Sequence, residues 1–322
     1  MRSLRRRLLS GLVLGFIVIL GLALLSDVRQ VTEHLAVFSW QLTPLILACT
    51  LFNYALRFVK WHYYLGLVGV HHLPLMESLR LFVGGFPLAV TPGKVGEALK
   101  GVWLNQRTGV PVARAVPVVV AERISDGLAV LALSTLGVIA YPGYWPAFAS
   151  ILGILVAGII LTQIRPVATG LISLAERLPL MGRLAGPLRE FYEGAYALFR
   201  PLPTLAAVTL GTVAWLGEGI GFYLVLRGLD VPPGWETLSA AVFVLSFSTI
   251  VGAVSTLPGG LGAAEASIAG MLRLLLALPA GTAAAATLLI RFATLWFGVA
   301  LGLGVWTVSR NLLFSGGKPE PE

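Results

Sequence analysis

Charged side chains stand out in this sequence because they occur inside stretches that are otherwise apolar. An ionisable group near the centre of a bilayer costs on the order of 2.5–3.5 kcal/mol, so charges at that depth must form ion pairs or face water. As a set they favour a polar cavity, although each one alone is equally consistent with a structural ion pair. Eight are expected at membrane depth: Lys94, Glu97, Glu122, Arg123, Asp126, Glu218, Glu265 and Arg291.

Helical geometry indicates how these charges find partners. Glu122 and Asp126 are one helical turn apart and share a face, whereas Arg123 points about 100° away from Glu122 and reaches a different neighbour. Glu122 and Arg123 are also consistent with a position near the cytoplasmic interface. The expected ion pairs are Arg123 or Lys94 with Glu97, and Arg291 with Glu265 or Glu218.

Two of the glutamates follow a proline-glycine break in an apolar segment. Breaks at corresponding places in two halves of a chain point to a transporter-type binding site. Each segment has too many helix breakers for a straight span, which predicts two re-entrant hairpins shielded by protein or water. Lys94 suits an anionic group, whereas Lys100 is expected to snorkel to the cytoplasmic surface. The breaks read Pro92-Gly93-x-x-Gly96-Glu97 and Pro258-Gly259-Gly260-x-Gly262-x-x-Glu265.

The composition indicates that the elements around these charges cross a membrane. The chain has 322 residues, of which 57% are hydrophobic and only 12% charged, against about 25% charged in soluble domains. The alternating segments of a β-barrel are not visible. The net charge of +8 lies between apolar segments, where it suits topology and anionic lipids rather than nucleic acid. We therefore predict an all-α polytopic membrane protein.

Six full spans are expected besides the hairpins, which occupy about 78–104 and 237–278. The first apolar run follows an arginine-rich start and reads as an uncleaved helix. The polar stretch after it is expected to be a short link, 26–40. The second span ends in Arg57, Lys60 and Trp61, which read as interfacial anchors. The predicted spans are about 8–25, 42–65, 116–141, 146–164, 202–226 and 283–308.

The charge distribution predicts the orientation. Both termini are expected in the cytoplasm, because this leaves only Arg29 and Arg227 in outer loops. An odd number of spans between the hairpins then makes the repeat inverted. We predict one integral membrane domain, 1–314, with half-repeats at about 42–141 and 202–308. An amphipathic cytoplasmic connector is expected at about 165–200, and a disordered tail at 315–322.

The sequence contains no recognisable catalytic, cofactor-binding or metal-binding motif, which favours a transporter over an enzyme. An ordered series of motifs instead resembles the lysylphosphatidylglycerol synthase transmembrane-region family, also described as flippase-like membrane proteins. The resemblance covers roughly residues 8–308. Besides the two breaks, it rests on Asn53-x-x-x-Arg57-x-x-x-Trp61, Glu122-Arg123-x-x-Asp126 and Arg291.

The resemblance implies a bacterial or archaeal plasma-membrane protein similar to the flippase half of the multiple peptide resistance factor, which moves aminoacylated phosphatidylglycerol between leaflets. The soluble aminoacyl-transferase domain of the bifunctional enzymes is not expected in this chain. Some archaeal relatives are associated with glycosylation of lipid-linked sugars, which keeps a lipid-modifying transferase as an alternative.

We therefore expect a lipid translocase for an anionic, aminoacylated or polyprenyl-phosphate-linked lipid. The breaks would meet near the membrane midplane and bind the headgroup, with no metal or cofactor. A non-catalytic scaffold is a third reading, in which the connector recruits a cytoplasmic protein or a second copy of the chain. The residues expected to bind the headgroup are the eight charged ones together with Arg57.

Overall fold

The apolar runs of the sequence fold as α-helices, and no β-strand occurs in the part of the chain that the structure describes. The structure is a computed structural model. It describes residues 11, 13–15, 17, 18, 21, 28–91, 96–140, 145–176 and 185–314. The predicted first span lies mostly outside these residues, as do the turn at 141–144 and the tail at 315–322.

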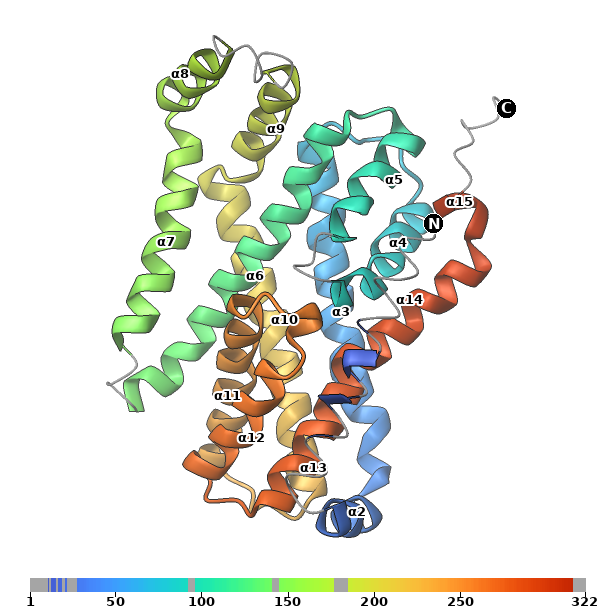
Figure 1. Cartoon of the computed structure of the whole chain (residues 1–322), viewed down its shortest axis with the longest axis vertical. Helices are drawn as coiled ribbons and strands as arrows, with labels where there is room; N and C mark the ends of the chain where they lie inside the picture. The colour runs from blue at the N-terminus through green and yellow to red at the C-terminus, as the bar shows by residue number, and fades with distance from the viewer. Residues whose placement is uncertain are drawn as a thin grey trace.

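Two long antiparallel helices form the central pair of the molecule (Figure 1). They are α3 (Thr43–Leu67) and α10 (Pro201–Gly228), and each has a proline in its first turn, where the missing N–H costs nothing. The two helices approach closely at Gly217 of α10, where an added Cβ would lie 2.7 Å from the ring of Phe52 and displace it.

A third long helix, α6 (Val112–Ala140), packs against both α3 and α10. It is followed by α7 (Trp145–Gln163), which lies at the outer edge of the molecule in Figure 1. Two shorter helices, α8 (Arg165–Glu176) and α9 (Ala185–Leu198), lie at one end of the molecule. Helix α9 packs against α6 through its apolar face, so the described part of the polar connector is mostly helical, in line with its amphipathic pattern.

Each of the two breaks separates a pair of helices. The first pair is α4 (Leu75–Gly84), with the 3₁₀ turn η2 (Phe86–Val90), and α5 (Leu99–Thr108). The second pair is α11 (Trp235–Val254), with the 3₁₀ turn η6 (Pro258–Gly260), and α12 (Ala263–Leu275). Figure 1 shows α4 and α5 in one half of the long axis and α11 and α12 in the other. The breaks meet between them, where η2 contacts η6.

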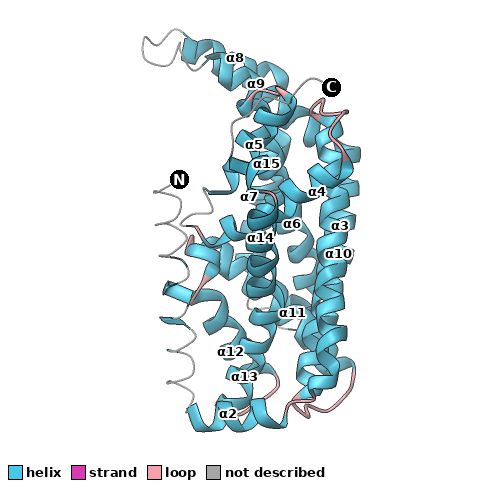
Figure 2. Cartoon of the chain, turned by 90° about the vertical axis from the view of Figure 1, so that its right-hand side faces the viewer, coloured by secondary structure: helices cyan, strands magenta, loops and turns pink. Residues whose placement is uncertain are grey.

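The last apolar run forms α13 (Ala280–Arg291), the π-helical turn η7 (Phe292–Trp296) and α14 (Phe297–Val308), followed by the short α15 (Arg310–Phe314). Helix α14 packs against α4 and η2. The indole Nε1 of Trp306 donates to the carbonyl oxygen of Gly84 at 2.7 Å, which fixes this contact. Helix α14 thereby supports the end of α4, just before the first break; Figure 2 shows α14 between the end of the molecule that carries α8 and the end that carries α2.

The stretch predicted as a polar link is not a simple loop. It contains α2 (Val28–Val37) and the 3₁₀ turn η1 (Trp40–Leu42). The prediction of a polar link assigned no helix here, but the polar residues of α2 alternate with apolar ones at helical spacing. Val31 is buried against α13, where it packs with Ala284 and Leu288.

Four helical stretches of the described residues are long and apolar enough to cross a membrane, or five if the bent pair at 149–163 and 165–174 counts as one span. These stretches support a polytopic helical membrane protein. The arrangement of six spans with two re-entrant hairpins stays a prediction. The four are Trp40–Leu67, Pro201–Gly228, Trp235–Val254 and Ala280–Val308.

Candidate functional site

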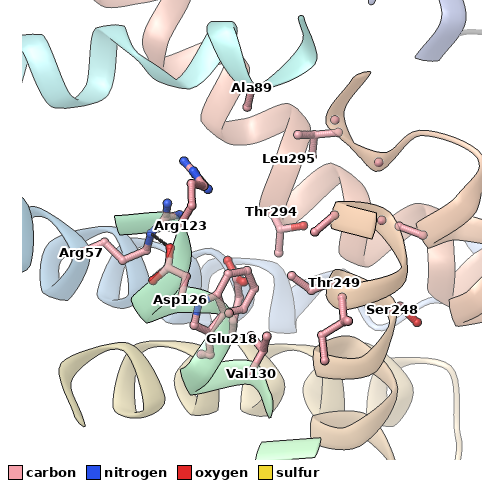
Figure 3. Close-up of a pocket in the computed structure, with 18 of the residues that line it drawn as sticks. Arg57, Ala89, Arg123, Asp126, Val130, Glu218, Ser248, Thr249, Thr294 and Leu295 are labelled. Carbon is pink, nitrogen blue, oxygen red and sulfur yellow. Dashed lines mark ion pairs between the residues drawn. The ribbon is translucent and has the colours of Figure 1, made fainter. Parts of the chain in front are cut away.

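A cavity of about 640 Å³ lies between the two breaks and the helices that surround them (Figure 3). Its size is typical of a ligand-binding pocket. Four cationic side chains and three carboxylates line it, which leaves one positive charge in excess if all are ionised. They are Arg57, Lys100, Arg123 and Arg291, and Glu97, Asp126 and Glu218.

The first break contributes Glu97, which is buried at 2% exposure. The Nε of Arg123 donates to its Oε2 at 2.8 Å. About a third of the Arg123 side chain stays exposed, and it faces the cavity. The hydroxyl of Thr91 accepts from the N–H of Gly96 at 3.1 Å and joins the two sides of the break. Pro92, Gly93 and Lys94 lie outside the described residues.

The second break is held by a similar pair. The Nε of Arg291 donates to Oε1 of Glu265 at 2.6 Å, and its Nη2 donates to the carbonyl oxygen of Gly259 at 2.9 Å. Glu265 also accepts from the N–H of Gly262 at 2.7 Å. The side chain of Glu265 therefore joins the turn before α12 to the end of α13. In both halves a glutamate after a break pairs with an arginine 26 residues later.

On the other side of the cavity, α3 and α6 share a carboxylate. The Nζ of Lys60 lies 2.5 Å from Oδ1 of Asp126, and the Nε of Arg57 lies 3.3 Å from Oδ2. Figure 3 shows Arg57 and Asp126 beside Glu218. The Arg57 contact lacks hydrogen-bond geometry, so its Nε has no hydrogen-bond partner among the described residues. Arg57 lines the cavity and is therefore one of its cations, with its Nε turned toward Asp126.

Lys100 lines the cavity from α5 and is buried at 2% exposure. Its Nζ donates to Oε2 of Glu122 at 3.1 Å and lies 4.8 Å from the ring centre of Trp61 and 5.2 Å from that of Phe82. The expected snorkelling of Lys100 is therefore wrong. The side chain of Glu122 is fully buried against this lysine, so it is an internal ion-pair partner, and its depth in the membrane stays a prediction.

Glu218 lines the cavity from α10 and is buried at 4% exposure. Within the described part of the chain, no cation lies within ion-pair distance of its carboxylate. It therefore differs from Glu97, Asp126 and Glu265, which all pair with arginine or lysine. A carboxylate buried in this way is available for a proton or for the cationic part of a ligand.

The structure thus brings most of the predicted site residues together. Glu122 and Glu265 do not line the cavity but hold residues that do. Of the glycines and prolines at the breaks, Gly259 and Gly260 line it. No three histidine, cysteine, aspartate or glutamate side chains of the described residues are grouped as metal ligands.

Lys60 is a residue that the sequence reading missed. It was interpreted as an interfacial anchor together with Arg57 and Trp61, but Lys60 and Trp61 are fully buried. A signal was present, because Arg57, Lys60, Trp61 and Tyr64 are spaced three and four residues apart and share one helix face. That face points toward α6 and Asp126 rather than toward the membrane surface.

Comparison with known proteins agrees with this architecture. Residues 12–302 match the family described as the lysylphosphatidylglycerol synthase TM region. The chain is also similar to a UPF0104 membrane protein of Methanothermobacter thermautotrophicus, with 26% identity over 311 residues that cover 90% of each chain. No solved structure matches the chain.

Proposed function

Because the chain belongs to the lysylphosphatidylglycerol synthase transmembrane-region family, we propose that it moves an anionic phospholipid between the leaflets of the membrane. The headgroup binds in the cavity between the two breaks. A polyprenyl-phosphate-linked lipid is the alternative substrate, and it presents the same phosphate chemistry to the site.

One observation carries the proposal, namely the matched pair of Glu97–Arg123 and Glu265–Arg291. Both pairs have the same spacing and direction, and both follow a Pro-Gly break that ends beside one cavity. An inverted repeat with broken helices at its centre allows alternating access to a fixed binding site. We infer that the breaks belong to two re-entrant hairpins that enter from opposite sides of the bilayer.

The charges around the cavity suit a phosphate-bearing headgroup. Arginine binds phosphate through several N–H donors at once. Arg57 and Arg123 both line the cavity, and about a third of the Arg123 side chain stays exposed beside its ion pair. Lys94, which follows Pro92 and Gly93 in the sequence of the first break, would add a further cation. Glu218 would receive a proton or a cationic part of the headgroup.

Leaflet exchange in reconstituted vesicles tests the proposal. Wild type should exchange labelled phosphatidylglycerol faster than protein-free vesicles. Arg123→Ala should slow this exchange at least tenfold, since a hydrogen bond to a charged group contributes about 1.5–3 kcal/mol. Arg123→Lys keeps the ion pair with Glu97 and should fall between the two.

Arg114→Ala is the matched control. Arg114 makes a partly exposed ion pair with Glu190 outside the cavity, so its loss should leave exchange unchanged. Equal rates in wild type, Arg123→Ala and protein-free vesicles would contradict the proposal. Exchange of labelled polyprenyl phosphate alone would select the alternative substrate, whereas a modified lipid product would indicate a transferase.

A further inference from the structure

The cavity has an apolar part that the binding of a headgroup does not explain. It continues from the charged side chains into a cluster formed by four helices, in which Val130, Leu131 and Ile250 are buried and the others partly buried. Trp215 lines this apolar part and is one turn before Glu218 on α10, so one face of α10 joins the apolar part to the charged part. The lining residues of this apolar part are Val130, Leu131, Ile151, Leu155, Trp215, Ile250 and Val254, which are some of the apolar residues that line the cavity.

This apolar part reaches the outer surface of the molecule. Val254, at the C-terminal end of α11, lines the cavity and is nevertheless 67% exposed. On α7, Ile151 and Leu155 are one turn apart and line the cavity, whereas Ile154 is 72% exposed and does not. The cavity therefore opens sideways between α7 and the end of α11, on the face that would meet lipid.

A phospholipid whose headgroup sits among the charged residues has to keep its chains in an apolar environment. Each methylene group that moves from hydrocarbon into water lowers the equilibrium constant for that transfer about fourfold, so exposing two whole chains to water is prohibitive. A closed cavity would force the chains against the charged side chains. A sideways opening with apolar walls lets them remain in the bilayer while the headgroup moves.

We propose that the hydrocarbon chains of the bound phospholipid leave the cavity through the opening between α7 and the C-terminal end of α11. This inference rests on the proposed function, because it gives a path to the hydrocarbon chains of the phospholipid whose headgroup that function places in the cavity. It adds a chain-binding surface, formed by Ile151, Leu155 and Val254, to the charged headgroup site.

Photo-crosslinking tests the opening without requiring transport. The full chain is reconstituted with phosphatidylglycerol that carries a diazirine in one acyl chain, and labelled residues are located by mass spectrometry. Leu155 should be labelled, and the label should fall at least fivefold with excess unlabelled phosphatidylglycerol or in Arg123→Ala. Ile154, which faces the bulk lipid, is the matched control and should respond to neither. Equal behaviour of the two residues would overturn the inference.

Blocking the opening after folding gives a second test. Cys49 is the single cysteine of the chain, so Val254→Cys and Ile154→Cys can each be labelled alone in a Cys49→Ala background. A bulky maleimide on Val254→Cys should slow exchange at least tenfold and leave binding of sn-glycerol 3-phosphate unchanged. The same label on Ile154→Cys should have no effect.

The two tests separate the two ideas. Unchanged exchange after labelling of Val254→Cys would contradict the opening while leaving the headgroup site intact. Absence of exchange in the unlabelled proteins would contradict the proposed function, and the crosslinking result would then still decide whether lipid chains occupy the opening.

Discussion

At the scale of single residues, the three charges in the middle of α6 are satisfied by three different parts of the chain. Glu122 pairs with α5, Arg123 with the first break, and Asp126 with α3. Removing one partner of a buried pair is much more costly than replacing both, because the remaining charge has no compensation. The stability of the first half should therefore depend strongly on α6.

Asp126→Asn should be among the most destabilising single substitutions. It leaves Lys60 and Arg57 buried without their shared carboxylate, and breaking a buried ion pair costs about 3–5 kcal/mol. The melting temperature in detergent, followed by the fluorescence of the eight tryptophans, should fall clearly below that of wild type.

Glu33→Gln is the control for this prediction. It removes an exposed ion pair with Arg29 of the kind that contributes little. Its melting temperature should match wild type, and an equal shift in both variants would contradict the importance of burial.

The sequence identifies which residues of the site are charged, but not where each charge points. Lys60 and Lys100 were both assigned to the surface, since a long cationic chain near a helix end can snorkel. Their burial depends on Asp126 and Glu122, which lie 66 and 22 residues further along the chain. Such a partner becomes visible only when the helices are packed.

At the scale of elements, the second break depends on glycine. Gly260 has a φ of +67°, and a Cβ there would lie 2.9 Å from the Cα of Gly252 in α11. The atoms of Gly252 that this Cβ would meet belong to the backbone, so no side chain can move aside to make room for it.

Gly260→Ala should therefore destabilise the protein by more than about 1 kcal/mol, from the unfavourable backbone conformation alone. Gly270→Ala in α12 is the control, since nothing lies within 4 Å of the position that its methyl group would take and alanine favours a helix. Thermal unfolding should shift down for the first variant and stay level or rise for the second.

The positions of the long helices follow from apolar run length, and their observed bounds differ little from the predicted ones. Helix α6, for example, was expected from 116 and begins at Val112. Helix α2 was missed because its ten residues are too few and too polar for hydropathy to reveal. Only its contact with α13 explains why it is ordered.

At the scale of the whole molecule, basic residues are distributed unequally between the two ends. Arg114, Arg165 and Arg189 belong to the end that carries α8 and α9, and α2 lies at the opposite end (Figure 1). By the positive-inside rule, the α8–α9 end is expected in the cytoplasm. The end that carries α2 is less free of arginine than the sequence suggested, because α12 ends there with Arg273 in its last turn.

Cysteine labelling in intact cells tests this orientation. In the Cys49→Ala background, Pro233→Cys before α11 should react with a membrane-impermeant maleimide. Gly186→Cys in α9 should react only after the membrane is made permeable. Both positions are exposed, so accessibility within the protein does not decide the result. The reverse pattern would place the α8–α9 end outside.

The buried pair of Lys60 and Asp126 has a consequence for biosynthesis. The two residues are 66 positions apart. Because a ribosome adds about 5–20 residues per second, Asp126 is synthesised about 3–13 s after Lys60. During that time Arg57 and Lys60 have no carboxylate from α6. A nascent chain halted at Pro111 should therefore leave α3 less completely inserted than one halted at Leu198, in which Asp126 has left the ribosome, as judged by alkylation of Cys49. Membrane integration of this protein would then be a delayed, pairwise event, in which one helix enters the bilayer only together with another.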